Sequence, residues 1–232
     1  GKQDLKYQQI SIDFQELLIK EAKETIWIGT EDEDGFDYTI SNYYEFQHNL
    51  PATDSNVVGF PARCEARKNL QFLKNVDSII FTKEVSMLSY LSRVKTKFTL
   101  PKTKLEEYSV EKIHDFYMSK DWGISHSCFV DEPFGYSILQ SIDYGKLPIL
   151  SNNWCEEMEY PFRASTRIQF EKQVANISNL SLEDRNNYLG KLRDYLSKYS
   201  SVEKWRDDFL SVYNKDGDQV WLPTNISPSK SV

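Results

Sequence analysis

The chain has 232 residues, of which 40% are hydrophobic and 27% charged, the balance of a folded globular protein rather than a disordered one. Its net charge of −7 predicts no overall electrostatic attraction to nucleic acid. The longest segment without Asp, Glu, Lys or Arg is 219–229, far shorter than the ~20 apolar residues of a membrane span. We therefore expect neither a transmembrane segment nor a secretory signal.

Three cysteines, Cys64, Cys128 and Cys155, are present without Cys-x-x-Cys spacing or any zinc-binding pattern. An odd number cannot all pair with one another, so we interpret them as reduced thiols of a cytoplasmic protein. The three histidines are scattered, and no metal site is predicted.

The hydrophobic pattern predicts short strands that alternate with amphipathic helices. Before residue 56 we expect a helix at 13–24, strands at 25–28 and 38–40, and a connecting segment at 43–55. Further strands are expected at 56–59, 78–81, 95–100, 122–125 and 147–150. Helices are expected near 67–74, 84–91, 109–118 and 136–144, and a Pro-Lys loop should follow residue 100. This alternation predicts an α/β protein with a Rossmann-like open parallel sheet and helices on both faces.

The last third of the chain is expected to be helical. Ser181 and Asp184 resemble a capping box that begins a helix reaching about residue 196. A second amphipathic helix is predicted at 202–212, and the tail at 223–232 should be loose.

Two segments carry residues suited to chemistry, and each lies between an expected strand and an expected helix. In the first, at 57–69, Arg63 and Lys68 lie near a helix start. Arginine can form paired hydrogen bonds to phosphate oxygens, lysine adds a mobile charge, and a helix N-terminus adds N–H donors, which together suit a diphosphate. Ordinary surface cations are the alternative, and charge spacing alone favours it.

The second segment covers 127–140. Phe134 and Gly135 can present backbone amides at a helix N-terminus, and Glu132 can accept hydrogen bonds from sugar hydroxyls. Glu132 can equally be a carboxylate that stabilises the helix dipole, and the residues alone leave both interpretations open.

In this order and separation, the two segments resemble the donor-binding, C-terminal half of a GT-B glycosyltransferase of the family four type. Arg63, Lys68 and Asn69 fit the first motif of that family. Glu132 fits the first carboxylate of its second motif, but Gln140 stands where the family has another Glu. The residues that also fit are Phe134, Gly135, Gly145 and Pro148.

The resemblance, over roughly residues 56–153, implies a nucleoside-diphosphate sugar as donor, retention of anomeric configuration and no obligatory metal or other cofactor. Arg63 and Lys68 would hold the diphosphate, and Glu132 would contact the transferred hexose. The amides around Phe134, Gly135 and Tyr136 would assist, and Gln140 would face the ribose with neutral hydrogen bonds in place of a carboxylate. The catalytic set is thus Glu132, Arg63 and Lys68.

The resemblance also implies a domain division. Residues 1–55 would be a remnant of an acceptor-side domain plus linker, 56–200 the donor-binding domain, and 201–232 a crossing helix with a loose tail. So short an N-terminal part predicts a fragment, or a chain that works with a missing acceptor domain or partner chain. The acceptor would be a glycan, a small molecule or modified DNA.

A narrower similarity links the chain to phage DNA α-glucosyltransferases. It rests on the Gly-x-x-Pro spacing at 145–148 and on the segment 41–46. It would imply a viral or bacterial source.

Two other classes of protein remain as alternatives. A non-catalytic module of the same fold, binding a nucleotide sugar or a partner, agrees with Gln140. A general dinucleotide-binding Rossmann protein is disfavoured because no Gly-x-Gly-x-x-Gly follows an expected strand.

Overall fold

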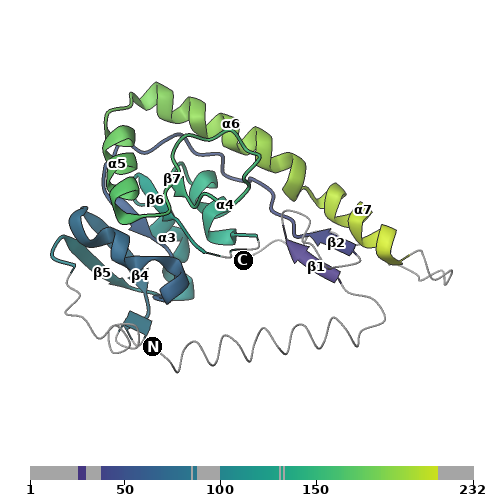
Figure 1. Cartoon of the computed structure of the whole chain (residues 1–232), viewed down its shortest axis with the longest axis horizontal. Helices are drawn as coiled ribbons and strands as arrows, with labels where there is room; N and C mark the ends of the chain where they lie inside the picture. The colour runs from purple at the N-terminus through teal and green to yellow at the C-terminus, as the bar shows by residue number, and fades with distance from the viewer. Residues whose placement is uncertain are drawn as a thin grey trace.

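The computed structural model describes residues 26–29, 38–84, 86–87, 100–130, 132 and 134–213. Its centre is a five-stranded sheet in which every pair of neighbouring strands is parallel (Figure 1). The strands are β3 (Val58–Phe60), β4 (Ser78–Thr82), β5 (Thr103–Glu107), β6 (Ile124–Ser127) and β7 (Leu147–Leu150). The expected open, Rossmann-like parallel sheet is confirmed.

The strand order, β5-β4-β3-β6-β7, determines where a ligand can bind. From β3 the chain builds outward through β4 to β5, then returns to place β6 on the other side of β3. Connections therefore leave the neighbouring strands β3 and β6 in opposite directions. In open α/β sheets this arrangement opens a crevice beyond the carboxyl ends of the two strands.

Helices cover both faces of the sheet. The helical elements are η1 (Ala66–Lys68), η2 (Leu70–Asn75), η3 (Val110–Lys112), α3 (Ile113–Met118), α4 (Tyr136–Asp143), α5 (Arg167–Ser178), α6 (Leu182–Ser200) and α7 (Val202–Tyr213). Side chains of a strand alternate between faces, so Phe81 packs on Phe116 of α3 while Ile80 joins the opposite core with Leu70 and Leu73 of η2. Within the described part of the chain, no helix has the length and hydropathy that a bilayer span requires.

Several expected elements differ in the structure. The helix expected at 67–74 is two short 3-10 helices, because Asn69 between them has a left-handed backbone with φ of 51°. β6 begins two residues later than expected. The strand β5 replaces the expected Pro-Lys loop, and Leu100 is not in a strand, while 95–99 lies outside the described residues. β5 is an edge strand with charged residues, which hides it from a search for hydrophobic runs.

Other expectations were partly met. The helix at 109–118 is divided into η3 and α3, and only residues 84, 86 and 87 of the one near 84–91 are described, as helical. The predicted helix at 13–24 and the tail at 223–232 lie outside the described residues. The helices α6 and α7 agree with the pattern, while α5, capped by Thr166, was not predicted as a separate element.

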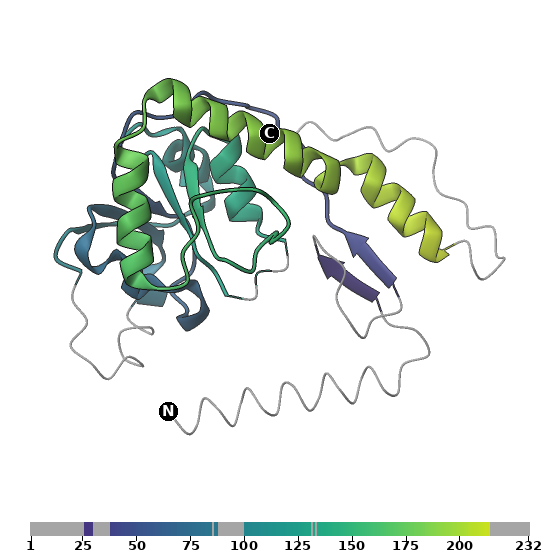
Figure 2. The same ribbon diagram turned by 45° about the horizontal axis from the view of Figure 1, so that its top comes forward.

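A second, two-stranded sheet lies apart from the first. It pairs β1 (Ile26–Gly29) with β2 (Tyr38–Ser41) in parallel. The helix α6 runs along the large sheet, and α7 continues beyond it to contact β2 (Figure 2). The division at residues 55 and 200 stays a prediction.

The buried Arg185 of α6 holds the segment that leads into β3. Its guanidinium donates to the carbonyl oxygens of Thr53 and Ser55, at 3.2 and 3.1 Å, and to that of Ile177, at 3.0 Å. The side chain is 1% exposed and bridges three parts of the chain. Burial lowers the pKa of Arg185, and the nearby charge of Asp54 offsets part of this shift.

We expect Arg185→Met to lower the free energy of unfolding by about 3 kcal/mol, because three carbonyl groups lose a charged donor and stay buried. The melting temperature should fall by roughly 6–12 °C. Arg206→Met, at an exposed position of α7, is the matched control and should change stability little. Urea titrations of both variants measure the effect, and equal stability of the two would contradict it.

Candidate functional site

A pocket of about 530 Å³ lies at the carboxyl ends of the central strands. It collects residues that directly follow β3, β4 and β5, together with Glu132 from the segment between β6 and α4. Four residues predicted from the sequence line it: Arg63, Lys68, Glu132 and Gln140. The two motifs therefore meet in the crevice that the strand order creates.

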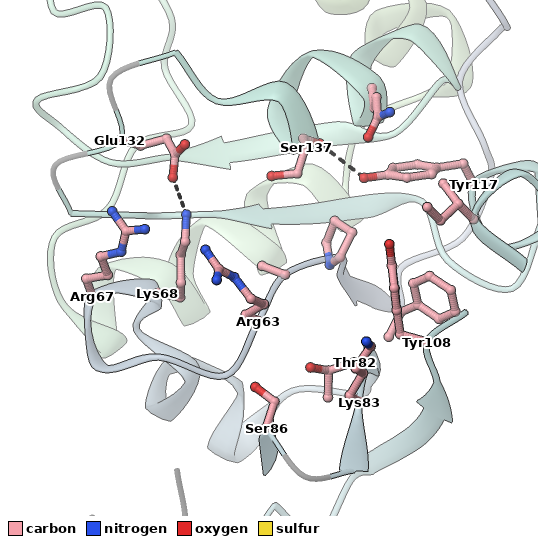
Figure 3. A pocket seen from close by; sticks show the side chains of 15 residues that line it. Arg63, Arg67, Lys68, Thr82, Lys83, Ser86, Tyr108, Tyr117, Glu132 and Ser137 are labelled. Carbon is pink, nitrogen blue, oxygen red and sulfur yellow. Dashed lines mark hydrogen bonds and ion pairs between the residues drawn. The ribbon is translucent and has the colours of Figure 1, made fainter. Parts of the chain in front are cut away.

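Lys68 is the buried cation of the pocket, with 7% of its surface exposed. Its Nζ forms an ion pair with Glu132 Oε2 (Figure 3). The same Nζ lies 4.0 Å from the ring centroid of Phe129. Burial lowers the pKa of Lys68, and the hydrogen bond and charge of Glu132 offset only part of this shift. Lys68 is therefore a cation held by its partner at a site that penalises an uncompensated charge.

The residue after Lys68 joins the two motifs. The left-handed backbone of Asn69 turns its side chain to the loop after β6, where Nδ2 donates to the carbonyl of Cys128 at 2.8 Å. The carbonyl of Asn69 in turn accepts a hydrogen bond from Nε2 of His126, at 3.1 Å. These bonds fix the loop after β3 against β6 and its loop, and so keep Lys68 near Glu132.

Two arginines stand beside this ion pair. Glu65 binds both, through Nε of Arg63 at 3.3 Å and Nε of Arg67 at 3.0 Å. Burial raises the pKa of Glu65, but the hydrogen bond from Arg67 and the charges of Arg63, Arg67 and Lys68 outweigh it and lower the pKa overall. The Arg63 side chain is 76% exposed, so it can turn toward a ligand at little cost.

The pocket has a charged end and an aromatic end. Figure 3 shows Arg63, Arg67 and Lys68 with Glu132 on one side, and Tyr108 and Tyr117 on the other. With Lys83, the described lining carries four cations against one carboxylate, which favours an anionic ligand. Among the described residues, no three His, Cys, Asp or Glu side chains form a group that could hold a metal.

Three predicted residues lie at the start of α4 without lining this pocket. Phe134 is buried, and Gly135 precedes the helix with φ of 78°, in the left-handed region that glycine adopts without strain. Tyr136 is exposed and lines a second pocket, which Gln140 shares. The carbonyl of Gly135 accepts hydrogen bonds from the N–H groups of Ile138 and Leu139, at 2.8 and 3.1 Å, which close the first turn of α4.

The lining residues without a predicted role include Arg67, Lys83, Tyr108 and Tyr117. Lys83 follows β4 as Arg63 follows β3, so the rule that ligands bind beyond strand ends could have identified it. Tyr108 directly follows β5, whose position was mispredicted. Tyr117 belongs to the short helix α3 and reaches the pocket only through tertiary packing.

We expect stability to depend on His126 between pH 6.5 and about 4. Complete burial lowers its pKa from the ordinary 6.5 to about 4, and Phe60 and Phe170 pack on the ring. The unfolded chain therefore takes up a proton at higher pH than the folded protein does. The stability that neutral His126 contributes is fully present above pH 6.5. As the pH falls from 6.5 to about 4, the free energy of unfolding should drop by up to about 3 kcal/mol.

The measurement is the free energy of unfolding at several pH values for the wild type and for His126→Phe, which has no titrating ring. As the pH approaches 4, the free energy of unfolding of the wild type should fall relative to that of His126→Phe. Parallel curves would show that His126 does not titrate in this way.

No family model and no curated protein matches the sequence. The structure is similar to the crystal structure of TarM, with a TM-score of 0.64 and 14% identity, over 85% of this chain and 44% of that one. It is also similar to the crystal structure of Anabaena Alr3699/HepE in complex with UDP, with a TM-score of 0.61 and 16% identity, over 85% and 65% of the two chains. The chain thus spans less than two thirds of either protein. At these identities the likeness concerns the fold, and the five-stranded sheet agrees with one half of a GT-B fold.

Proposed function

We propose that this chain supplies the donor site of a glycosyltransferase that uses a nucleoside-diphosphate sugar. The observation that carries the proposal is the meeting of Lys68 and Glu132, 64 residues apart in sequence, in one pocket with Arg63. Each belongs to one of the two family-like motifs. Their convergence at the crevice between β3 and β6 is what binding of one ligand by both motifs requires.

The diphosphate would lie at the charged end. Arg63 can form two parallel hydrogen bonds to phosphate oxygens, while Lys68 adds a charge already positioned by burial. Negative charge develops on the departing nucleotide as the glycosidic bond breaks. Fixed cations at this point stabilise that charge in the transition state more than in the ground state, which is how they would accelerate transfer.

Glu132 would exchange partners when the donor binds. Once a phosphate group compensates Lys68, the carboxylate is available to accept hydrogen bonds from hydroxyls of the sugar. The backbone donors around Gly135 and Tyr136, at the positive end of α4, lie on the same segment of chain. Together these groups would orient the sugar and its leaving group.

The nucleoside would occupy the aromatic end. Tyr108, which is partly exposed, offers apolar ring surface to a base, and Gln140 offers an amide to the ribose, while the buried Tyr117 supports this end of the pocket from the core. We propose a uridine nucleotide, supported by the UDP bound in the similar HepE structure.

We further propose transfer with retention, in the cytoplasm, to an acceptor held with the help of a further domain or partner chain. The odd number of cysteines and the absence of Cys-x-x-Cys spacing support a reducing compartment. A binding module that transfers nothing is the second candidate, and Gln140 favours it. Release of UDP from UDP-glucose in the presence of an acceptor panel distinguishes the two, because a module binds the donor without turnover.

We expect Arg63→Ala combined with Lys68→Ala to weaken UDP binding about 100-fold. Each cation contributes about 1.5 kcal/mol or more of charge-assisted hydrogen bonding, and 1.4 kcal/mol is tenfold in affinity. Titration calorimetry measures the change. The matched control is Arg167→Ala with Lys172→Ala, which removes two cations of the same spacing from α5, away from the pocket. Equal affinity of the two double variants would remove the phosphate role.

We expect Glu132→Gln to separate sugar from nucleotide. UDP-glucose should bind about tenfold more weakly, through loss of a charged acceptor for the sugar hydroxyls. UDP alone should bind as well as before or more tightly, because a negative charge beside the phosphates is removed. Calorimetry with both ligands decides, and equal losses for both would argue against contact with the sugar.

A further inference from the structure

A second pocket, of about 400 Å³, lies between α4 and the segment that leads into β3. Four tyrosines line it: Tyr43 and Tyr44 from the linking segment, Tyr136 at the start of α4, and Tyr144, which directly follows that helix. The only one of these that the family resemblance had singled out was Tyr136, and then for its backbone amide. The aromatic composition of the pocket is thus not explained by the donor site.

Its walls are held in place by the buried carboxylate of Asp143, which is 1% exposed. The two oxygens of Asp143 accept hydrogen bonds from the backbone N–H groups of Gln47, His48 and Asn49, at 3.2, 2.9 and 2.8 Å. The hydroxyl of Tyr44 donates to the same carboxylate at 3.2 Å. The linking segment is therefore fixed on α4 before any ligand binds, as a preformed site requires.

The second pocket has the opposite charge to the first. Its described lining includes the carboxylates of Glu45 and Asp143 and no Lys or Arg, whereas the donor pocket has four cations. A phosphate-bearing ligand such as a nucleic acid would be repelled here and attracted there. The charge thus disfavours an anionic ligand in the second pocket.

Two of the tyrosines present their rings to solvent, Tyr43 with 47% and Tyr136 with 48% of their surface exposed. Each is supported from behind, Tyr43 by Trp205 of α7 at 5.6 Å between ring centroids and Tyr136 by Phe134 at 4.7 Å. A sugar ring has C–H faces that pack on such rings and hydroxyl edges that need polar partners. Glu45 supplies an acceptor in the same pocket.

Gln140 lines both pockets, so a molecule in the second pocket lies beside the donor site. We propose that the second pocket is a subsite for a neutral carbohydrate acceptor, with Tyr43 and Tyr136 as its stacking surface and Glu45 as a hydroxyl acceptor. The acceptor role rests on the proposed donor function. Carbohydrate binding itself rests only on the geometry and charge of this pocket.

The test is saturation-transfer NMR with maltose, cellobiose and lactose, each measured with and without UDP. At least one disaccharide should give a signal with the wild-type chain. Tyr43→Ala and Glu45→Ala should each reduce that signal at least fivefold while UDP affinity stays within twofold. Glu45 is exposed and its replacement leaves the ring packing intact, so it covers the case in which Tyr43→Ala disturbs α7. Ile168→Ala, 74% exposed on α5, is the control.

The outcomes separate the two proposals. No disaccharide signal, or signals that neither variant reduces, would overturn the carbohydrate subsite even if UDP binds. A phosphorylated sugar or an oligonucleotide that binds and is lost in Glu45→Ala would overturn it too. Disaccharide binding without any UDP binding would support the subsite as a carbohydrate site and remove the donor function.

Discussion

The ion pair between Lys68 and Glu132 is the interaction on which the rest of the site depends. Burial penalises the ammonium group, so Lys68 is tolerable only beside a negative partner. Without a ligand Glu132 fills that role. A diphosphate, the ligand proposed above, is a second anion that could take the place of Glu132 beside Lys68. The pairing also keeps Lys68 in position, which lowers the ordering cost of binding.

The fold brings the pair together through a few hydrogen bonds between loops. Asn69 receives a bond from His126 and donates one to Cys128, so the loop after β3 cannot move away from β6 independently. His126 can serve here because it is neutral, enclosed by aromatic rings that lower its pKa. His126 thus packs in the aromatic core and also links the two loops through its hydrogen bond to Asn69.

Two pockets of opposite charge share one helix. Ser137 and Gln140 of α4 line the proposed donor pocket, while Tyr136, Gln140 and Asp143 line the other. A charged diphosphate and a neutral sugar need such different surroundings. Because both pockets border α4, the helix sets the distance between them, and a helix is more rigid than a loop.

The alternation of strands and helices could be read from the hydrophobic pattern because buried strands and amphipathic helices have distinct periods. The edge strand β5 could not, since its charged side chains carry no such period. With β5 misplaced, Tyr108 was not recognised as a residue at a strand end. The turn at Asn69 was missed for a related reason, because a left-handed asparagine stabilised by partners more than fifty residues away has no local signal.

The residue types alone determined which side chains could bind a diphosphate and a sugar, since Arg63, Lys68 and Glu132 have those capacities wherever they lie. Tertiary structure decided that they line one pocket, by placing β6 directly beside β3. Tertiary structure also created the second pocket, because the tyrosines that line it come from segments nearly a hundred residues apart. Contacts between distant segments depend on the packing of the whole sheet, and no spacing within one segment encodes them.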